Sequence, residues 1–294
     1  MADMNPLLIT SCGLVGATFV RVLAEQGCRC AESYYPGVDE PRGRAVDIAS
    51  EESVTDLFAQ TQPRTVILSA ALTNVEFCQE NRDIAWKINV NGARNVARAC
   101  KAERARLVFF SSDYVFDGAA GPYSETDAPH PISVYGETKL AAESFIRETL
   151  EDHLIVRTTI VYGYEALGKN FCYRLINTLK AGQRIKVPAD QSGSPTYARN
   201  LVEIVVDLLN KGRTGVYNVV GKDLVDRYEF SKRVCRVFGL DESLLDPVTT
   251  RELAQKAPRP LKAGLRMDKV MRESSVAVMG VDDGLASFKK ELYG

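Results

Sequence analysis

Histidine is scarce in this 294-residue chain, which holds only His130 and His153, and Cys28 and Cys30 are its only closely spaced cysteine pair. Because a four-ligand zinc site needs clustered cysteine and histidine side chains, the sequence predicts no bound metal. Seven cysteines scattered through apolar runs are an odd number, which favours free thiols over a disulfide framework. We therefore expect a protein of the reducing cytoplasm.

An excess of charge of either sign is also missing, because 37 Lys and Arg residues balance 38 Asp and Glu residues. Without a basic surplus the chain is not expected to bind nucleic acid. No apolar run approaches the roughly 18 residues of a membrane-spanning helix, and the residues before Leu7 lack the charged start of a secretory signal. We expect no membrane partner and no export.

Short apolar runs alternate with helical patterns in the first half of the chain. Strand-like runs lie at 7–10, 29–31, 65–71, 106–110 and 154–159, and helical patterns at 18–26, 54–60, 84–101 and 138–150. Strands that are continuously apolar are typical of a sheet covered on both faces. The alternation predicts an α/β protein with a doubly wound parallel Rossmann sheet.

The alternation of strand-like runs and helical patterns ends after residue 163. From there on, turn-rich segments alternate with helical patterns at 201–209 and 227–238. We expect residues 1–163 to form an NADP-binding Rossmann domain, to which some later segments return. Residues 164–294 are expected to form mainly a smaller C-terminal substrate-binding lobe.

The first strand-like run leads into Thr10-Ser11-Cys12-Gly13-Leu14-Val15-Gly16, the place of a dinucleotide-binding glycine loop. In such a loop one glycine lets the backbone approach the pyrophosphate and another allows close packing of helix on strand; Gly13 and Gly16 keep these roles. Thr10 stands where the first glycine is expected, and a β-branched residue is poorly suited to positive φ. The loop alone is weak evidence for a cofactor.

Three residues in the middle of the chain, Ser112, Tyr135 and Lys139, together predict carbonyl chemistry. Ser112 falls at the carboxyl end of a strand, where open α/β sheets bind ligands. Tyr135 and Lys139 lie four residues apart in a helical pattern and therefore share one face. We expect the Lys139 ammonium to lower the pKa of Tyr135, which could then exchange a proton with a ketone oxygen that Ser112 polarises.

Together these features resemble the extended short-chain dehydrogenase/reductase family, and within it the dTDP-4-dehydrorhamnose reductase group, along essentially the whole chain. The most specific motifs are SSDYVFDG at 111–118 and DQSGSPT at 190–196. The others are LLITSCGLVG at 7–16, Asp47-Ile48, AALTNVE at 70–76, INV at 88–90, YGETK at 135–139, the segment 157–163, and Arg259-Pro260 with Leu265.

The resemblance implies a role for each matching residue. Tyr135 would be the general acid, Lys139 its partner and the ribose anchor, Ser112 the ketone-polarising hydroxyl, and Asn89 the holder of a proton-relay water. The implied cofactor contacts are Thr10, Gly13, Leu14, Val15, Gly16, Asp47, Ile48, Ala70, Ala71 and Thr73, besides Tyr135 and Lys139. The expected substrate contacts are Asp113, Tyr114, Asn170, Asp190 and Gln191, although Asp113 could equally be a turn or cap residue.

The implied activity is an NADPH-dependent reduction of the C4 ketone of a nucleotide-activated 6-deoxyhexose, as in dTDP-4-dehydrorhamnose reductase. The stretch Ser33-Tyr34-Tyr35, where the family can carry an acid for the ribose 2′-hydroxyl, holds no acid to repel a 2′-phosphate. This favours NADPH, while nearby Glu32 keeps NADH open. Ile160 stands where family members often carry tryptophan, so the identity of the sugar stays open. The alternatives are a regulatory subunit that resembles the β subunit of methionine adenosyltransferase and a nucleotide-sugar epimerase or dehydratase; a homodimer is compatible with the sequence.

Overall fold

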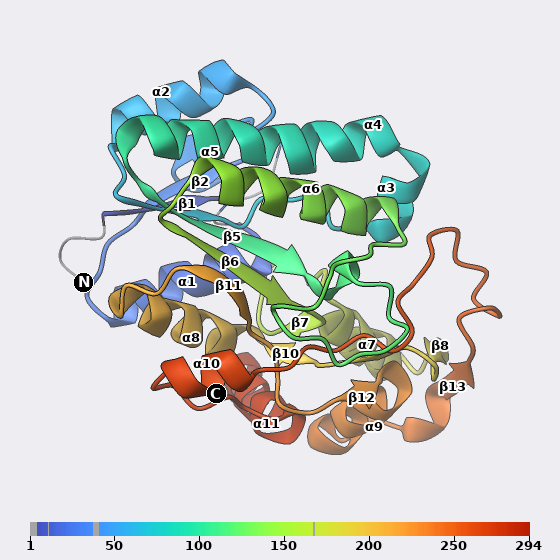
Figure 1. Ribbon diagram of the computed structural model, residues 1–294. Helices are drawn as coiled ribbons and strands as arrows, with labels where there is room; N and C mark the ends of the chain where they lie inside the picture. Colours follow the sequence, from blue (N-terminus) through green and yellow to red (C-terminus); the bar gives the residue numbers. More distant parts are fainter. Residues whose placement is uncertain (1–4, 11, 38–40, 167) are drawn as a thin grey trace.

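The computed structural model describes residues 5–10, 12–37, 41–166 and 168–294 (Figure 1). Its centre is a seven-stranded sheet with the order β11-β6-β5-β4-β1-β2-β3, and every neighbouring pair of strands is parallel. The strands are β1 (Pro6–Ile9), β2 (Ala31–Tyr34), β3 (Arg44–Ala45), β4 (Thr65–Leu68), β5 (Arg106–Ser112), β6 (His153–Thr158) and β11 (Gly215–Asn218). The order reverses between β1 and β4, which is the arrangement of dinucleotide-binding sheets.

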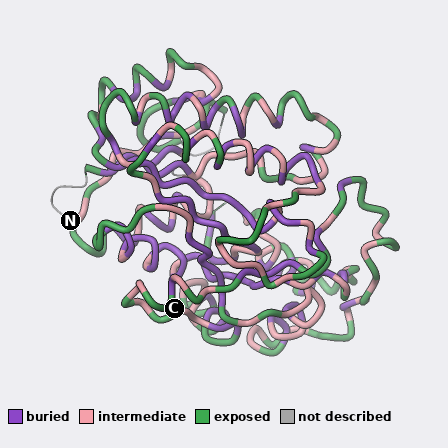
Figure 2. The backbone as a smooth tube through the Cα atoms, in the orientation of Figure 1, coloured by how far each residue is buried: buried purple, intermediate pink, exposed green. Residues whose placement is uncertain are grey.

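Helices cover both faces of this sheet (Figure 1). On one face, α1 (Leu14–Glu25) and α8 (Ala198–Asn210) share a core with strand residues such as Leu8 and Val108. On the other, α2 (Glu51–Thr61), α5 (Gly92–Glu103) and α6 (Val134–Thr149) bury side chains against Leu7 and Phe109. Figure 2 shows buried backbone running through the strands between these layers. The predicted doubly wound α/β fold is confirmed.

A third core belongs to the C-terminal half. It is formed by α7 (Phe171–Lys180), α9 (Arg227–Phe238) and α11 (Val281–Tyr293), whose buried members include Leu175, Phe230 and Phe288. Three short strand pairs join this region: β7 (Val161–Tyr162) with β10 (Thr196–Tyr197), β8 (Ile185–Pro188) with β13 (Leu245–Val248), and β9 (Ser192–Gly193) with β12 (Val225–Asp226). α8 and β11, which follow residue 163, join the layers of the central sheet. The division of the chain at residue 163 stays a prediction.

The remaining elements are short. They are α3 (Val75–Glu80), α4 (Arg82–Ala85), a π-helical turn at Trp86–Asn91, 3-10 turns at Asp113–Val115 and Glu242–Leu244, and α10 (Asp268–Glu273). Within the described residues, no helix is both long and apolar enough to span a membrane. No group of three or more histidine, cysteine, aspartate or glutamate side chains in those same residues could hold a metal ion.

The predicted strand at 29–31 was wrong, because β2 begins only at Ala31 and ends at Tyr34. The apolar run around Cys28 and Cys30 precedes the strand. β2 itself is mostly polar and is held by pairing with β1, and the buried Ser33 donates its hydroxyl to the Leu8 carbonyl at 2.9 Å. Backbone pairing and one polar contact therefore determine where this strand forms, and neither produces an apolar pattern in the sequence.

Candidate active site

Ser112 and Tyr135 meet where β5 ends and α6 begins. Ser112 is the last residue of β5, and its hydroxyl acts on the pKa of the nearby Tyr135 phenol. The Ser133 hydroxyl caps α6 by accepting from the Gly136 N–H at 3.3 Å. A Cβ on Gly136 would come within 2.1 Å of the Tyr114 carbonyl oxygen, so glycine here lets the first turn of α6 lie against the residues after Ser112. The geometry thus brings the predicted serine and tyrosine together.

Burial dominates the electrostatics of Tyr135 and Lys139. The Tyr135 side chain is almost fully buried, and this raises its pKa above the ordinary value, although the Ser112 hydroxyl acts in the opposite direction. Burial lowers the pKa of Lys139 to about 8, and its Nζ lies 4.6 Å from the centre of the Phe109 ring. The expected lowering of the Tyr135 pKa is therefore wrong. Tyr135 holds its proton at neutral pH, which is the form that a general acid needs.

Asp113 is a buried carboxyl group beside this pair. It accepts hydrogen bonds from the Ser112 hydroxyl, at 3.1 Å, and from the Thr159 side chain. Burial raises its pKa to about 6, while these hydrogen bonds and the positive charge of Arg227 oppose the increase. The cap of the turn that follows β5 is Ser112, which accepts from the Tyr114 N–H at 3.3 Å. Ser112 therefore caps this turn, and the role of Asp113 as a substrate contact stays a prediction.

A pocket opens beside Asp113 and Tyr114. Its walls come from the turn after β5, the segment after β6, the DQSGSPT segment, the start of α9 and the chain near residue 260; the lining residues are Asp113, Tyr114, Thr159, Ile160, Gln191, Ser192, Gly193, Arg227, Pro260 and Ala263. Arg227 is the first residue of α9 and the only arginine in this lining. The sequence predicted its helix, but no local signal showed that the start of the helix faces Asp113.

The other expected substrate contacts differ in their surroundings. Gln191 lines the pocket, and its amide donates to the Thr250 hydroxyl at 3.0 Å and to Gln255 at 3.1 Å. Asp190 accepts from the Thr250 N–H with both carboxylate oxygens, each at 2.9 Å. Asn170 caps α7, accepting from the Tyr173 N–H at 3.0 Å. Asp190 and Asn170 are not in the pocket lining, and their role as substrate contacts stays a prediction.

The N-terminal loop fits an anionic group. Gly13 occupies the N-cap position of α1 and has no side chain to accept from the first turn, whereas Ser50 and Asp226 cap α2 and α9. A Cβ at Gly13 would meet no atom within 4 Å, so the approach to this helix end is open. Exposed N–H groups and the helix dipole at such an end bind phosphate. Leu14, Val15 and the buried Gly16 form the first turn of α1.

Thr10 adopts the left-handed backbone conformation that glycine normally supplies in this loop. Its φ is +68°. Its carbonyl accepts from the Ser69 hydroxyl at 3.0 Å, and its N–H donates to the Ser33 hydroxyl at 3.4 Å. The substitution therefore keeps the turn but places a β-branched side chain in a costly conformation. Ser11 lies outside the described residues.

Asp47 and Ile48, the expected adenine contacts, lie in the segment that follows β3. The Asp47 carboxylate accepts from the Ala49 N–H at 2.9 Å, and Ile48 is buried. A Cβ on Gly92 would lie 2.7 Å from the Ile48 side chain, so α5 packs closely here because residue 92 is glycine.

Asn89 connects the segment after β4 with α6 through hydrogen bonds. It lies in the π-helical turn, a distortion often found at functional sites. Its amide oxygen accepts from the Leu72 N–H at 2.8 Å, and its amide nitrogen donates to the Leu72 carbonyl at 3.0 Å and to the Thr138 hydroxyl at 3.1 Å. The half-buried Ala70 and Ala71 and the exposed Thr73 flank Leu72. Asn89 therefore fixes the segment expected to face the cofactor ribose and phosphates.

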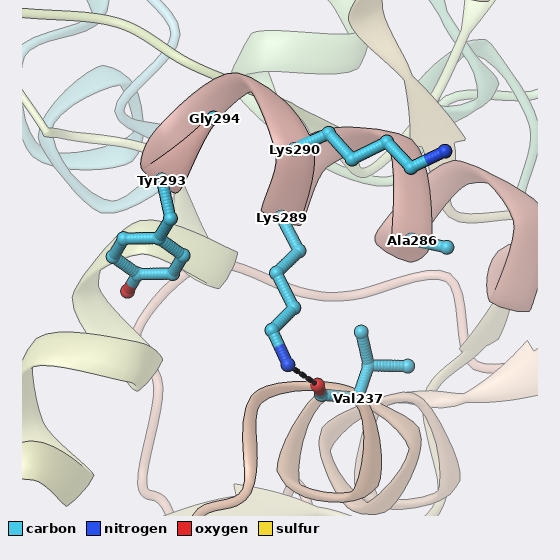
Figure 3. Close-up of a pocket in the computed structure, with 6 residues that line it drawn as sticks. All are labelled: Val237, Ala286, Lys289, Lys290, Tyr293 and Gly294. Carbon is cyan, nitrogen blue, oxygen red and sulfur yellow. Dashed lines mark hydrogen bonds between the residues drawn. The ribbon is translucent and has the colours of Figure 1, made fainter.

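A second pocket lies far from this chemistry, between α9 and the C-terminal turn of α11. Figure 3 shows Tyr293, Lys289, Lys290 and Ala286 from α11 around Val237, with Lys289 Nζ donating to the Val237 carbonyl at 2.7 Å. None of the predicted site residues lines it. We therefore place the candidate active site at the Ser112–Tyr135 junction.

The strand order, the open N-terminal end of α1 and the serine, tyrosine and lysine near the carboxyl edge of the sheet are those of an extended short-chain dehydrogenase/reductase. The chain belongs to the RmlD substrate binding domain family, whose model matches residues 4–293. The expected membership of the dTDP-4-dehydrorhamnose reductase group is thereby confirmed.

Curated relatives and a solved structure agree with this placement. A probable low-salt glycan biosynthesis reductase from Haloferax volcanii is 32% identical over 284 residues, which cover 94% of each chain. The dTDP-4-dehydrorhamnose reductase of Escherichia coli is 30% identical over 301 residues, covering 99% of this chain and 98% of its own. The crystal structure of dTDP-4-dehydrorhamnose reductase from Bacillus anthracis in complex with NADP is 30% identical, with a TM-score of 0.89 and coverage of 98% and 99% of the two chains.

Proposed function

We propose that this protein is an NADPH-dependent reductase that converts the C4 ketone of a nucleotide-activated 6-deoxyhexose into a hydroxyl. dTDP-4-dehydrorhamnose is the leading candidate substrate. One observation carries the proposal: a buried, protonated Tyr135 lies beside Ser112 at the carboxyl end of β5, next to a pocket. The dTDP-4-dehydrorhamnose reductases among the relatives support the choice of sugar.

The roles follow from the positions of the hydroxyl groups. When bound, NADPH supplies the hydride that reduces the carbonyl carbon. Ser112 turns its hydroxyl from Asp113 to the ketone oxygen and donates a hydrogen bond to it, and Tyr135 transfers its proton to that oxygen as negative charge develops there. The Lys139 ammonium, one helical turn from Tyr135, favours the phenolate that remains. The buried surroundings strengthen each of these interactions.

The cofactor is expected along the carboxyl edge of the sheet, across the point where the strand order reverses. The turn at 13–16 faces its pyrophosphate, Asp47 and Ile48 its adenine, and the segment 70–73 its ribose and phosphates. At the end of β2 the Ser33 hydroxyl is committed to the Leu8 carbonyl, and exposed Arg44 lies on the neighbouring β3, where a cation favours the 2′-phosphate of NADPH over NADH. The NADP in the Bacillus anthracis structure supports this preference.

The lining of the pocket beside Asp113 and Tyr114 carries groups that recognise a sugar joined to an anionic nucleotide, although the cavity itself holds only about 20 Å³. Arg227 is its cation, and the Gln191 amide adds a polar wall. Asp113 is placed to accept from a sugar hydroxyl. We include a cytoplasmic location in the proposal, which the odd number of cysteines supports, and a homodimer.

The test is a fluorescence titration of the purified protein with NADPH and with NADH, followed by addition of dTDP-4-dehydro-6-deoxy-L-mannose. Tight NADPH binding and its oxidation by the sugar are the expected results. Binding without oxidation would contradict the proposed substrate and favour another sugar or the epimerase alternative. No binding of either cofactor would contradict the reductase and favour the regulatory-subunit alternative.

A further inference from the structure

Two of the motifs noted in the sequence meet at the candidate site without a role in the mechanism. Glu76 lies in the first turn of α3, and Arg259 lies 183 residues further along the chain. Arg259 Nη2 and Glu76 Oε1 form an ion pair at 2.5 Å. The Arg259 side chain is only 9% exposed and that of Glu76 is 35% exposed, so water screens this pair less than it screens a surface pair.

The guanidinium of Arg259 also holds Tyr114. Its Nη1 donates to the Tyr114 hydroxyl at 3.2 Å. The Tyr114 ring in turn packs edge to face against Tyr135, with ring centres 5.5 Å apart and planes at 75°. A continuous set of contacts therefore runs from Glu76 through Arg259 and Tyr114 to the proposed proton donor.

The backbone around Arg259 is fixed from two sides. The second carboxylate oxygen of Glu76 accepts from the Lys256 N–H at 2.8 Å. Beyond Arg259, the Lys262 N–H donates to the Gly118 carbonyl at 2.8 Å. Gly118 has a φ of +73°, and a Cβ there would lie 2.5 Å from the Cα of Pro260, so the close approach requires glycine. Pro260, which follows Arg259, also lines the pocket.

The same contacts argue against Arg259 as a binding group for the substrate diphosphate. Its charge is neutralised by Glu76, and two of its N–H groups are already used by Glu76 and Tyr114. Arg227, by contrast, lines the pocket, where its positive charge acts on Asp113. The planar guanidinium of an arginine that already forms an ion pair is suited to holding a neighbouring group in place.

We propose that Glu76 and Arg259 are positioning residues, which hold Tyr114 against Tyr135 and thereby keep the proton donor directed at the ketone oxygen. This inference rests on the proposed reductase function. A small displacement of a reacting group lowers the rate of a positioned reaction steeply. The pair should therefore affect turnover, and the Kd for NADPH should change little, because the expected pyrophosphate and adenine contacts at 13–16 and 47–48 do not include Glu76 or Arg259.

The experiment compares Glu76→Gln with Glu80→Gln. Glu80 is the matched control, because it lies one turn further along α3 and pairs with the exposed Lys256 side chain of the same segment without touching Arg259. We expect Glu76→Gln to lower kcat about tenfold, with the Kd for NADPH within about twofold, and Glu80→Gln to match the wild type. Arg259→Lys should lower kcat similarly, and the double variant should be no slower than the slower single variant.

A second readout does not depend on turnover. 3-Fluorotyrosine placed at position 135 reports the surroundings of that ring by ¹⁹F NMR. We expect its signal to shift or broaden in Glu76→Gln and to stay unchanged in Glu80→Gln. An unchanged signal and unchanged kcat in Glu76→Gln would overturn the positioning role. A wild-type protein that oxidises no NADPH but still shows the Glu76-specific shift would contradict the proposed function and leave the pair supported.

Discussion

Replacing Thr10 by glycine tests how the first turn of the cofactor loop is held. At a φ of +68° a side chain with a Cβ costs about 1–2 kcal/mol, and glycine removes this cost. Glycine adds about 0.5–1 kcal/mol of backbone entropy loss on folding. The contacts of Thr10 with Ser33 and Ser69 use its backbone and survive the change. The variant should therefore gain about 0.5–1 kcal/mol in free energy of unfolding, a rise in Tm of about 1–4 °C.

Urea and thermal unfolding of the wild type, Thr10→Gly and Thr214→Gly give the comparison. Thr214 is exposed and outside the set of residues with positive φ, so glycine there relieves no strain and should lower the free energy of unfolding by up to about 1 kcal/mol. NADPH should bind Thr10→Gly at least as tightly as the wild type. If Thr10→Gly loses as much stability as Thr214→Gly, the strain argument is refuted.

Three further predictions concern buried polar groups. The Arg157 guanidinium donates two hydrogen bonds to the Glu143 carboxylate, at 3.0 and 2.7 Å, in the buried layer between β6 and α6. Glu143→Gln leaves the buried charge of Arg157 uncompensated and should lower the free energy of unfolding by about 3–5 kcal/mol, measured by thermal unfolding. Replacing both residues together by Leu and Met should recover most of this loss. The pKa of about 6 for Asp113 means that the folded chain keeps a proton between pH 4 and 6 that the unfolded chain has lost. Stability should therefore fall as pH rises through that window, by roughly 3 kcal/mol, and Asp113→Asn should remove this fall in urea titrations at pH 4 and pH 8; a variant that keeps the full pH dependence contradicts the assignment. Asn89→Leu leaves the Leu72 N–H without its partner, and we expect a loss of about 1–3 kcal/mol in stability together with weaker NADPH binding by calorimetry; unchanged affinity would show that this segment does not face the cofactor.

How much of the fold the sequence predicts depends on the length of each element. The helix expected at 227–238 is α9 with the same bounds, because Asp226 caps its start and Gly239, at a φ of +67°, ends it. The two-residue strands of the C-terminal region show no periodicity and form only through their partners, so no pattern could predict them. β2 was misplaced for a related reason, since its residues are polar and its pairing with β1 decides its position.

The candidate site also has features that the sequence predicts and features that it does not. Local spacing placed Tyr135 and Lys139 on one face of a helix, and a strand end placed Ser112 beside them. The sign of the Tyr135 pKa shift was wrong because spacing shows a neighbouring charge but not the burial that outweighs it. Arg227 and the Glu76–Arg259 pair come from segments far apart in the sequence, and only the folded chain brings them to the pocket.

The most direct test of the proposed chemistry is to follow NADPH oxidation by dTDP-4-dehydro-6-deoxy-L-mannose in the wild type and in Tyr135→Phe. Phenylalanine keeps the ring packed against Tyr114 and removes only the hydroxyl beside Ser112. We predict that turnover falls by about 10²–10⁴-fold while the Kd for NADPH stays within about twofold of the wild-type value. A variant that oxidises NADPH at a near-normal rate would contradict the proton transfer from Tyr135.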